Sequence, residues 1–554
     1  MPRAVLAALL CLVLAMFHTW PLTAAPSRYS LNYNADAELN AWIVSWIAYA
    51  LTHEPARLFA GNIFQPDDRA LAYSEPLVVP ALAGAPIRWM GGSAVLTFNL
   101  LLIAGLAATA FAGWWVVDQW TASFAGALVA GALLAFNTHL LTRLPHLQAA
   151  HAWGLILAFF FTDRLLRQQG GTAPLAVTLA AIAATSAYWL IFAGVLMLVL
   201  VAVGPRSSAA VRRLAVACLL GALLAMPVLL PYARLAGEGV RRPIEQAEQL
   251  SASPSAYLVS SSVVDRGWSR RFFTRDIDVL FPGFIALGLA TIGVLANVRA
   301  DAVARRRSLA LVLAGFVGFV LSFGPATSLY RMAFRALLPL QGLRVPARFG
   351  YLPLFAIAIL AGLGVAALQR MALRLNPRMG PSRAPGGVAG IIAVAAVTFE
   401  AWHGPVPTTP FAGVPAIYSR LDAEPSPALL VEVPFWPAEA VFGNAEYVLN
   451  ATGHRAPIMN GYSGYTPDSY RRRAQWFWFF PESWAIDAMR HEGATHVMVH
   501  LEQFGADAEG VRAALASQRE LELVASDSAG HLLYRFAGRA RGPLKGLART
   551  MAAR

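Results

Sequence analysis

Long apolar runs recur along the chain and alternate with short polar or arginine-rich segments. Many of these runs approach the roughly 20 residues that a helix needs to cross a bilayer. The pattern therefore predicts about 11 transmembrane helices. They are expected near 4–22, 94–117, 122–137, 149–163, 173–187, 188–203, 212–230, 279–297, 308–323, 349–368 and 387–402. The first run is long for a signal peptide, which favours an uncleaved first membrane helix.

The hydrophobic pattern changes character after residue 402. "PALLVEVPFW" and "ATHVMVHL" are typical of strands, and "SWAIDAMRHEG" is typical of an amphipathic helix. "ELELVASDSAGHLLYRF" alternates apolar residues on both sides of a turn at Ser528 to Gly530, which predicts a hairpin. We expect a transmembrane domain over 1–402, with a first outer loop at 23–93, and a small α/β domain over 403–554.

Composition supports a polytopic membrane protein rather than several soluble domains. Hydrophobic residues make up 57% of the chain and charged residues only 14%, against about 25% charged residues in ordinary soluble domains. The net charge of +13 does not indicate nucleic acid, because no soluble segment combines a basic face with a known binding pattern. The two cysteines lie in apolar runs and form no metal or redox motif.

Arginine gives the chain its sidedness, because positive charge is retained on the cytoplasmic side of a membrane. With eleven spans, the arginine clusters fall on alternate ends of the helices. The clusters are Arg164/Arg167, Arg206/Arg212/Arg213, Arg299/Arg305/Arg306/Arg307 and Arg370/Arg374/Arg378/Arg383. This arrangement puts the loop at 23–93 and the α/β domain outside, on the periplasmic or extracellular face.

The first outer loop opens with "SLNYNADAELNAW", in which Asp36 and Glu38 stand two residues apart, and continues into an expected interfacial helix over 40–51. The order of these elements resembles that of the GT-C superfamily of integral membrane glycosyltransferases: one span, a long outer loop of this kind, many further spans and an outer α/β tail. "LPHLQAAHAWGLILAFFFTDRLL" and "LPLQGLRVPARFGYLPL" also look like stretches of poorly characterised bacterial members placed near that superfamily. The resemblance covers about residues 1–400 and implies a GT-C-like membrane fold in the bacterial inner membrane.

The resemblance further implies transfer of a hexose or pentose from a polyprenyl-phosphate donor to a glycan, lipid or protein acceptor on the outer face. Asp36 matches the family's first-loop acid, implied to be the general base, and Glu38 would be its neighbour. Whether a divalent cation joins them stays open. Both acids would share a side only in an extended segment and would diverge on a helix. Alternatively, Asp36 caps a helix, or both acids only solvate the loop.

Four cationic side chains are candidate ligands for the donor phosphate. Arg143 and His146 precede a span on the outer side, where a polar cluster at the membrane edge is the simpler interpretation. Pro346 is expected to start a helix, so Arg348 lies in its first turn, where amides and the helix dipole favour an anion. Arg344 stands just before, and both arginines could instead snorkel to lipid headgroups.

Glu75 precedes the short apolar segment at 75–90, which we expect to lie on or dip into the membrane surface. Its carboxylate could bind a cation or the acceptor, or it could simply cap a helix or lie in an exposed turn.

Two other classes of function compete with the glycosyltransferase. A lipid or solute transporter would carry ionisable residues near the membrane midplane and often repeated halves, whereas these spans are nearly free of charge and show no repeat. A non-catalytic envelope glycan assembly protein, with a binding domain outside, is the third hypothesis.

Overall fold

The computed structural model describes residues 2–205, 207–275, 278–375, 385–424 and 428–538. Within these ranges the chain forms two compact units. The first comprises residues 1–26, 76–80 and 99–408, and the second comprises residues 27–75, 81–98 and 409–554. Most of the first outer loop therefore groups with the tail rather than with the membrane helices.

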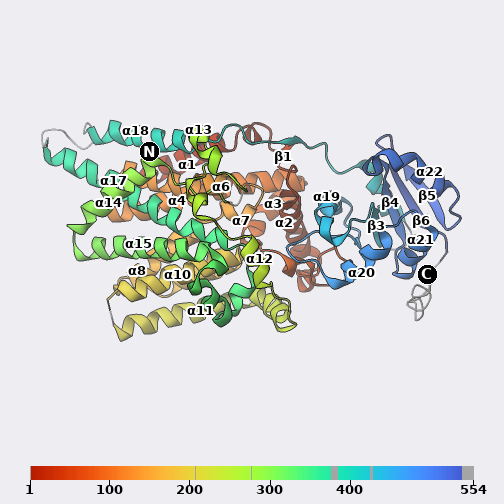
Figure 1. Ribbon diagram of the computed structural model, residues 1–554, viewed down its shortest axis with the longest axis horizontal. Helices are drawn as coiled ribbons and strands as arrows, with labels where there is room; N and C mark the ends of the chain where they lie inside the picture. Colours follow the sequence, from red (N-terminus) through yellow and green to blue (C-terminus); the bar gives the residue numbers. More distant parts are fainter. Residues whose placement is uncertain (1, 206, 276–277, 376–384, 425–427, 539–554) are drawn as a thin grey trace. The chain divides into compact units, whose positions relative to one another are not determined.

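Unit 1 is a bundle of helices (Figure 1). Its longer helices are α1 (Arg3–His18), α4 (Ala94–Thr121), α5 (Phe124–Ala135), α8 (Trp153–Leu166), α9 (Ala173–Ala183), α10 (Ala187–Val203), α11 (Ser208–Gly237), α14 (Phe284–Val298), α15 (Ala302–Ser322), α16 (Ser328–Ala336), α17 (Tyr351–Leu375) and α18 (Pro385–Glu400). Short helices connect them: α6 (Thr138–Leu141), α7 (Leu147–Ala150), α12 (Ile244–Gln249) and α13 (Arg266–Ser269). Helix α3 (Val78–Trp89) begins in unit 1, but most of its residues belong to unit 2.

Each of the eleven predicted ranges overlaps one of these helices. Among the described residues, three helices are long and apolar enough to cross a membrane, namely Ala94–Thr121, Ser208–Gly237 and Pro346–Leu375. Several others are apolar but have only 10–17 residues. The membrane character of the chain is thus established by its helices, while the number of eleven spans stays a prediction.

Helix α17 is the centre of unit 1 and packs against α5, α14 and α15. Glycines allow α17 and α14 to touch along their backbones. A Cβ atom at Gly364 would collide with the carbonyl of Leu289, and one at Gly293 would collide with the carbonyl of Leu360. Small residues at helix contacts are how membrane bundles gain close packing without a hydrophobic driving force. The rigid α17 fixes the position of the residues at its N-terminal end.

The arginine clusters at the ends of α8 and α15 meet at one acid. Arg167 and Arg307 both form ion pairs with the buried Asp163, at 2.9 and 2.8 Å. The two helix ends therefore lie on the same face of unit 1, as the predicted sidedness requires. Three arginines used in that prediction, Arg206, Arg378 and Arg383, lie outside the described residues.

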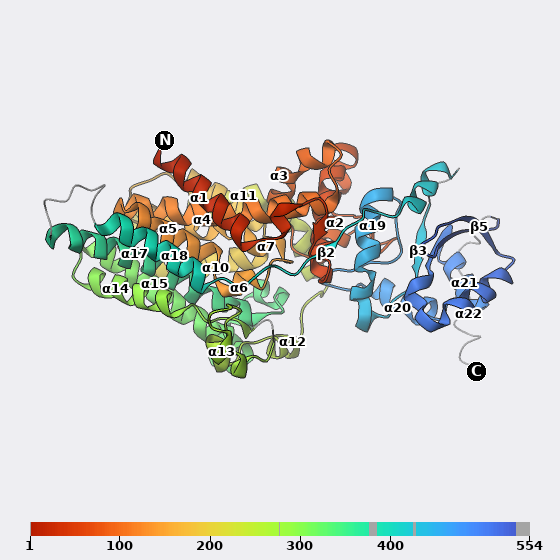
Figure 2. The same ribbon diagram turned by 90° about the horizontal axis from the view of Figure 1, so that it is seen from above.

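Unit 2 combines a long helix with a four-stranded mixed sheet (Figure 2). The sheet order is β3-β4-β6-β5, with β3 parallel to β4 and the other pairs antiparallel. The strands are β3 (Leu430–Val433), β4 (His496–His500), β5 (Leu521–Ser526) and β6 (His531–Phe536). The helices are α2 (Ala35–His53), α19 (Ala445–His454), α20 (Asp468–Phe477), α21 (Ser483–His491) and α22 (Ala508–Ala516). The strands, α21 and the β5–β6 hairpin lie where the sequence pattern predicts them.

The first loop is joined to the tail by backbone pairing inside unit 2. The amides of Phe64 and Gln65 donate to the carbonyls of Asn460 and Ile458, and the amide of Ile458 donates to the carbonyl of Asn62. A two-residue ladder adds to this, because β1 (Tyr29–Ser30) pairs with β2 (Thr409–Pro410). Loop 27–75 and the tail therefore form one folded body rather than two independent ones.

Candidate functional site

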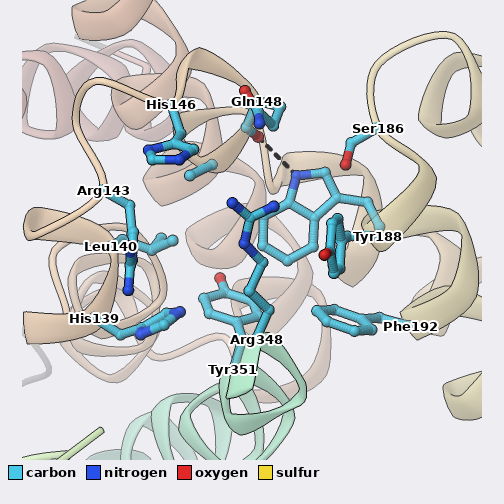
Figure 3. Close-up of a pocket in the computed structure, with 12 residues that line it drawn as sticks. His139, Leu140, Arg143, His146, Gln148, Ser186, Tyr188, Phe192, Arg348 and Tyr351 are labelled. Atoms are coloured by element: carbon cyan, nitrogen blue, oxygen red, sulfur yellow. Dashed lines mark hydrogen bonds between the residues drawn. The ribbon is translucent and has the colours of Figure 1, made fainter. Parts of the chain in front are cut away.

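A pocket lies within unit 1 where several short helices converge, and its empty space, including the part open to solvent, is about 390 Å³ (Figure 3). Helix α6, the following turn and α7 supply one wall, and the start of α10 supplies the opposite wall. The turn that leads into α17 closes the remaining side. The lining residues are His139, Leu140, Arg143, His146, Gln148, Ala149, Ser186, Tyr188, Trp189, Phe192, Arg348 and Tyr351.

Three of the predicted phosphate ligands, Arg143, His146 and Arg348, line this one pocket. The two stretches that carry them lie about 200 residues apart in sequence, and the fold brings them together. Arg348 lies in a 3₁₀ turn, Pro346–Gly350, that leads directly into α17. Its guanidinium lies 4.5 Å from the ring centroid of Tyr188, close enough for a cation–π contact that fixes the side chain.

Two other predicted ligands lie elsewhere. Arg344 is half-buried in the segment between two 3₁₀ turns and does not line the pocket. Glu75 is half-buried just before α3 and is also absent from the lining. The structure thus separates Arg348 from Arg344, although the two arginines are only four residues apart.

His139 is the pocket residue that sequence reasoning missed. Burial, and after it the neighbouring charge of Arg143, lower the pKa of His139 to about 3, although the hydrogen bond to the carbonyl of Val279 raises it. Nδ1 lies 3.1 Å from this carbonyl, which can only accept, so Nδ1 carries the proton of the neutral ring. The permanent positive charges of the pocket therefore come from Arg143 and Arg348.

The pocket walls are rigid and largely aromatic. The indole of Trp189 donates to the carbonyl of Gln148 at 2.7 Å, and the hydroxyl of Tyr351 donates to the carbonyl of Leu134 at 3.0 Å. Gln148 Oε1 and Ser186 Oγ are buried without a hydrogen-bond partner among the described residues. Such atoms are costly unless a ligand or water satisfies them. They give the pocket polar groups besides its cations.

The chemistry of this lining fits an anion. Among the described residues that line the pocket there is no carboxylate, whereas there are two arginines. Guanidinium groups match the oxygens of a phosphate with two parallel hydrogen bonds, and such bonds are stronger where water is excluded. The aromatic walls offer apolar surface to the rest of a ligand.

The predicted acids lie in unit 2, on the first turns of α2. The helix begins at Ala35, earlier than predicted, because Asn34 caps it by accepting from the amide of Asp36 at 2.9 Å. Asp36 and Glu38 therefore lie on a helix and point to different sides, so they do not form an adjacent pair. The hydroxyl of Tyr462, from the tail, donates to Asp36 Oδ1 at 2.9 Å. Asp36 is half-buried and its carboxylate is held in place by this contact.

Glu38 is buried, with only 8% of its surface exposed. Burial, and after it the nearby charge of Glu446 on α19, raises the pKa of Glu38 to about 8. At neutral pH this side chain mostly keeps its proton, so it is a poor general base and a good hydrogen-bond donor. Of the two predicted acids, Asp36 is the less buried.

The raised pKa of Glu38 predicts a pH-dependent effect of Glu38→Gln. The folded-state pKa lies above the unfolded value near 4.5, so ionisation costs stability as the pH rises from about 5 to 8. Glutamine mimics the neutral carboxyl, so the stability of the variant should lie within about 1 kcal/mol of that of the wild type at pH 5. The variant should be more stable by about 4 kcal/mol at and above pH 8. Thermal unfolding in detergent at pH 5, 6.5 and 8 measures this difference.

The matched control is Glu509→Gln, which replaces a glutamate whose side chain is 87% exposed in the same unit. It should shift the unfolding temperature little at any pH. A difference between Glu38→Gln and the wild type that stays constant from pH 5 to 8 contradicts the assignment of a protonated Glu38.

Comparison with known proteins finds likeness in structure rather than in sequence. No protein-family profile and no curated protein matches the chain. The arabinofuranosyltransferase AftD from Mycobacteria superposes with a TM-score of 0.59 at 17% identity over 97% of this chain. The chain spans only 40% of the length of AftD. ArnT from Cupriavidus metallidurans, solved bound to undecaprenyl phosphate, superposes with a TM-score of 0.53 at 13% identity, over 98% of this chain and 99% of its own.

Proposed function

The chain has the fold of the GT-C membrane glycosyltransferases, and on that premise we propose that it transfers a sugar from a polyprenyl-phosphate donor to an acceptor on the outer face of the membrane. The observation that carries the proposal is the aromatic-walled pocket with two arginines and no lining carboxylate. Its chemistry suits one phosphate group attached to an apolar chain. The binding of undecaprenyl phosphate by ArnT, a protein of the same fold, supports the choice of donor.

In the proposed step the donor phosphate binds Arg348 and Arg143, and Asp36 acts as general base. Asp36 removes the proton of an acceptor hydroxyl, and the resulting oxygen forms a bond to the anomeric carbon. The bond between that carbon and the phosphate oxygen breaks, and polyprenyl phosphate leaves with the bonding pair. A single displacement of this kind inverts the anomeric centre. The arginines stabilise the negative charge of the departing phosphate, which is larger after cleavage than before.

The experiment uses the purified full-length chain in proteoliposomes with a panel of labelled polyprenyl-phosphate hexoses and pentoses. We expect release of polyprenyl phosphate, and transfer of label to an acceptor in an envelope extract, for one or a few members of the panel. Addition of a chelator in a parallel sample shows whether a divalent cation takes part. Vesicles without protein and vesicles with Asp36→Asn are the controls.

The same experiment separates the rival functions. Movement of an intact lipid or solute across the vesicle membrane without cleavage of the sugar–phosphate bond would establish transport instead. Binding of glycan with no release of polyprenyl phosphate from any member of the panel would establish a non-catalytic protein.

A further inference from the structure

Two histidines and a glutamate converge at one edge of the sheet in unit 2. His500 ends β4 and His531 begins β6, and the antiparallel register places the two residues directly opposite each other. The chain then turns from β4 into a 3₁₀ segment, Leu501–Asp507, which returns Glu502 to the pair. Glu502 Oε1 lies 3.7 Å from His500 Nδ1 and 3.5 Å from His531 Nε2.

The far nitrogen of each imidazole is held by a carboxylate. His500 Nε2 lies 2.7 Å from Glu432 Oε2, and His531 Nδ1 lies 2.7 Å from Asp527 Oδ2. These contacts orient both rings so that the remaining nitrogens face Glu502. A carboxylate behind each histidine is the arrangement that orients imidazoles toward a metal ion and raises their basicity.

We propose that His500 Nδ1, His531 Nε2 and Glu502 bind a zinc ion. Ligand bonds of about 2.0–2.2 Å in a tetrahedron place neighbouring ligand atoms about 3.4 Å apart. The separations of 3.5 and 3.7 Å are close to this spacing, and all three ligand atoms lie within 4.8 Å of one another. Two imidazoles and one carboxylate are a donor set that zinc prefers, with water in the fourth position.

The burial of the cluster is a second observation that points to a ligand. His500 is completely buried, and its Nδ1 has no hydrogen-bond partner among the described residues. A buried polar atom without a partner is expensive, and a metal bond satisfies it. The side chain of Glu502 is 46% exposed, so the fourth position of the ion can be reached from solvent.

The charges around the histidines also favour a cation. Glu432 is completely buried, and its carboxylate accepts from the hydroxyl of Tyr418 and contacts the ring of His500. Burial lowers the pKa of His500, yet the hydrogen bond to Glu432 and the nearby carboxylate of Glu502 outweigh it and raise that pKa to about 9. Zinc would displace the second proton of the His500 ring and would balance the negative charge of Glu432 and Glu502. A permanent imidazolium at His500 is the alternative that the experiment must exclude.

The test is a titration of the full-length protein in detergent, stripped with a chelator, with zinc by calorimetry and with cobalt by visible absorption. We expect one zinc per chain, the visible bands of a four-coordinate cobalt ion, and a higher unfolding temperature with zinc. His531→Ala and Glu502→Gln remove ligands and should abolish stoichiometric binding. Asp527→Asn removes only the hydrogen bond behind His531 and should weaken binding by about 10–100-fold.

Glu509→Gln is the matched control, because this glutamate is exposed and lies on α22, away from the ligand set. It should bind zinc as the wild type does. Glu502→Gln keeps the size of the side chain, so its far-UV circular dichroism without metal should match that of the wild type and exclude misfolding. Absence of zinc and cobalt binding in the wild type, or binding that survives both His531→Ala and Glu502→Gln, overturns the proposal in favour of the imidazolium.

Discussion

Replacing Asp36 by asparagine is expected to lower kcat for sugar transfer by about 10²–10⁴-fold, the usual contribution of a general base. Asparagine keeps the shape of the side chain and can still accept from the hydroxyl of Tyr462, so the fold should persist. The amide cannot take up the acceptor's proton. Because this residue acts on the acceptor, the KM for the lipid-linked donor should change little. Steady-state transfer from the donor identified in the proteoliposome panel measures both constants.

Asp68→Asn is the control for this variant, since Asp68 lies in the same unit with a side chain that is 80% exposed. Its kcat should equal that of the wild type. Tyr462→Phe tests the positioning of the carboxylate. It should lower kcat by a smaller factor, about 10-fold, and shift the pH profile of kcat, which a purely structural role would leave in place. Full activity of Asp36→Asn would remove Asp36 from the mechanism.

The second large effect is expected from Arg348→Ala, which should raise the KM for the donor by about 10–100-fold. A hydrogen bond to a charged group contributes about 1.5–3 kcal/mol, and this arginine can offer two to one phosphate. Arg348→Lys keeps the charge but loses the paired geometry, so it should recover only part of the affinity. Direct binding of undecaprenyl phosphate, the leaving group, should weaken in the same order.

Two further arginines make this experiment specific. Arg335→Ala changes an exposed arginine of α16 and should leave the KM unchanged. Arg344→Ala distinguishes the pocket from the sequence pattern, because Arg344 was a predicted ligand but does not line the pocket. A larger effect at Arg344 than at Arg348 would show that the phosphate binds elsewhere.

The sequence predicted much of the helical architecture because apolar runs of membrane length are a strong local signal. It placed the start of α2 too late, since "ADAEL" looks polar and the capping role of Asn34 depends on backbone geometry. The sequence predicted Arg143 and Arg348 as phosphate ligands separately, each from its position at a helix end. Their convergence in one pocket depends on the packing of α17, and packing between distant segments leaves no local pattern.

Other parts of the site gave no readable signal. Tyr188 stands in apolar surroundings, where a tyrosine resembles ordinary core, and His139 stands in a polar turn, where a histidine resembles an ordinary loop residue. The buried state of Glu38 depends on α19, which follows it by about 400 residues. The meeting of His500 and His531 depends on the pairing of β4 with β6, whereas the sequence predicted only the adjacent β5–β6 hairpin.

The pairing of the first loop with the tail has a consequence for the order in which the protein matures. Tyr462 follows Asp36 by 426 residues, and the partners of Phe64 and Gln65 lie at 458–460. During synthesis the loop therefore lacks the contacts that bury Glu38 and hold Asp36 until most of the chain has been made. Contacts of such long sequence separation form late. Helix α2 thus acquires its final surroundings only after the helices of unit 1 have been synthesised.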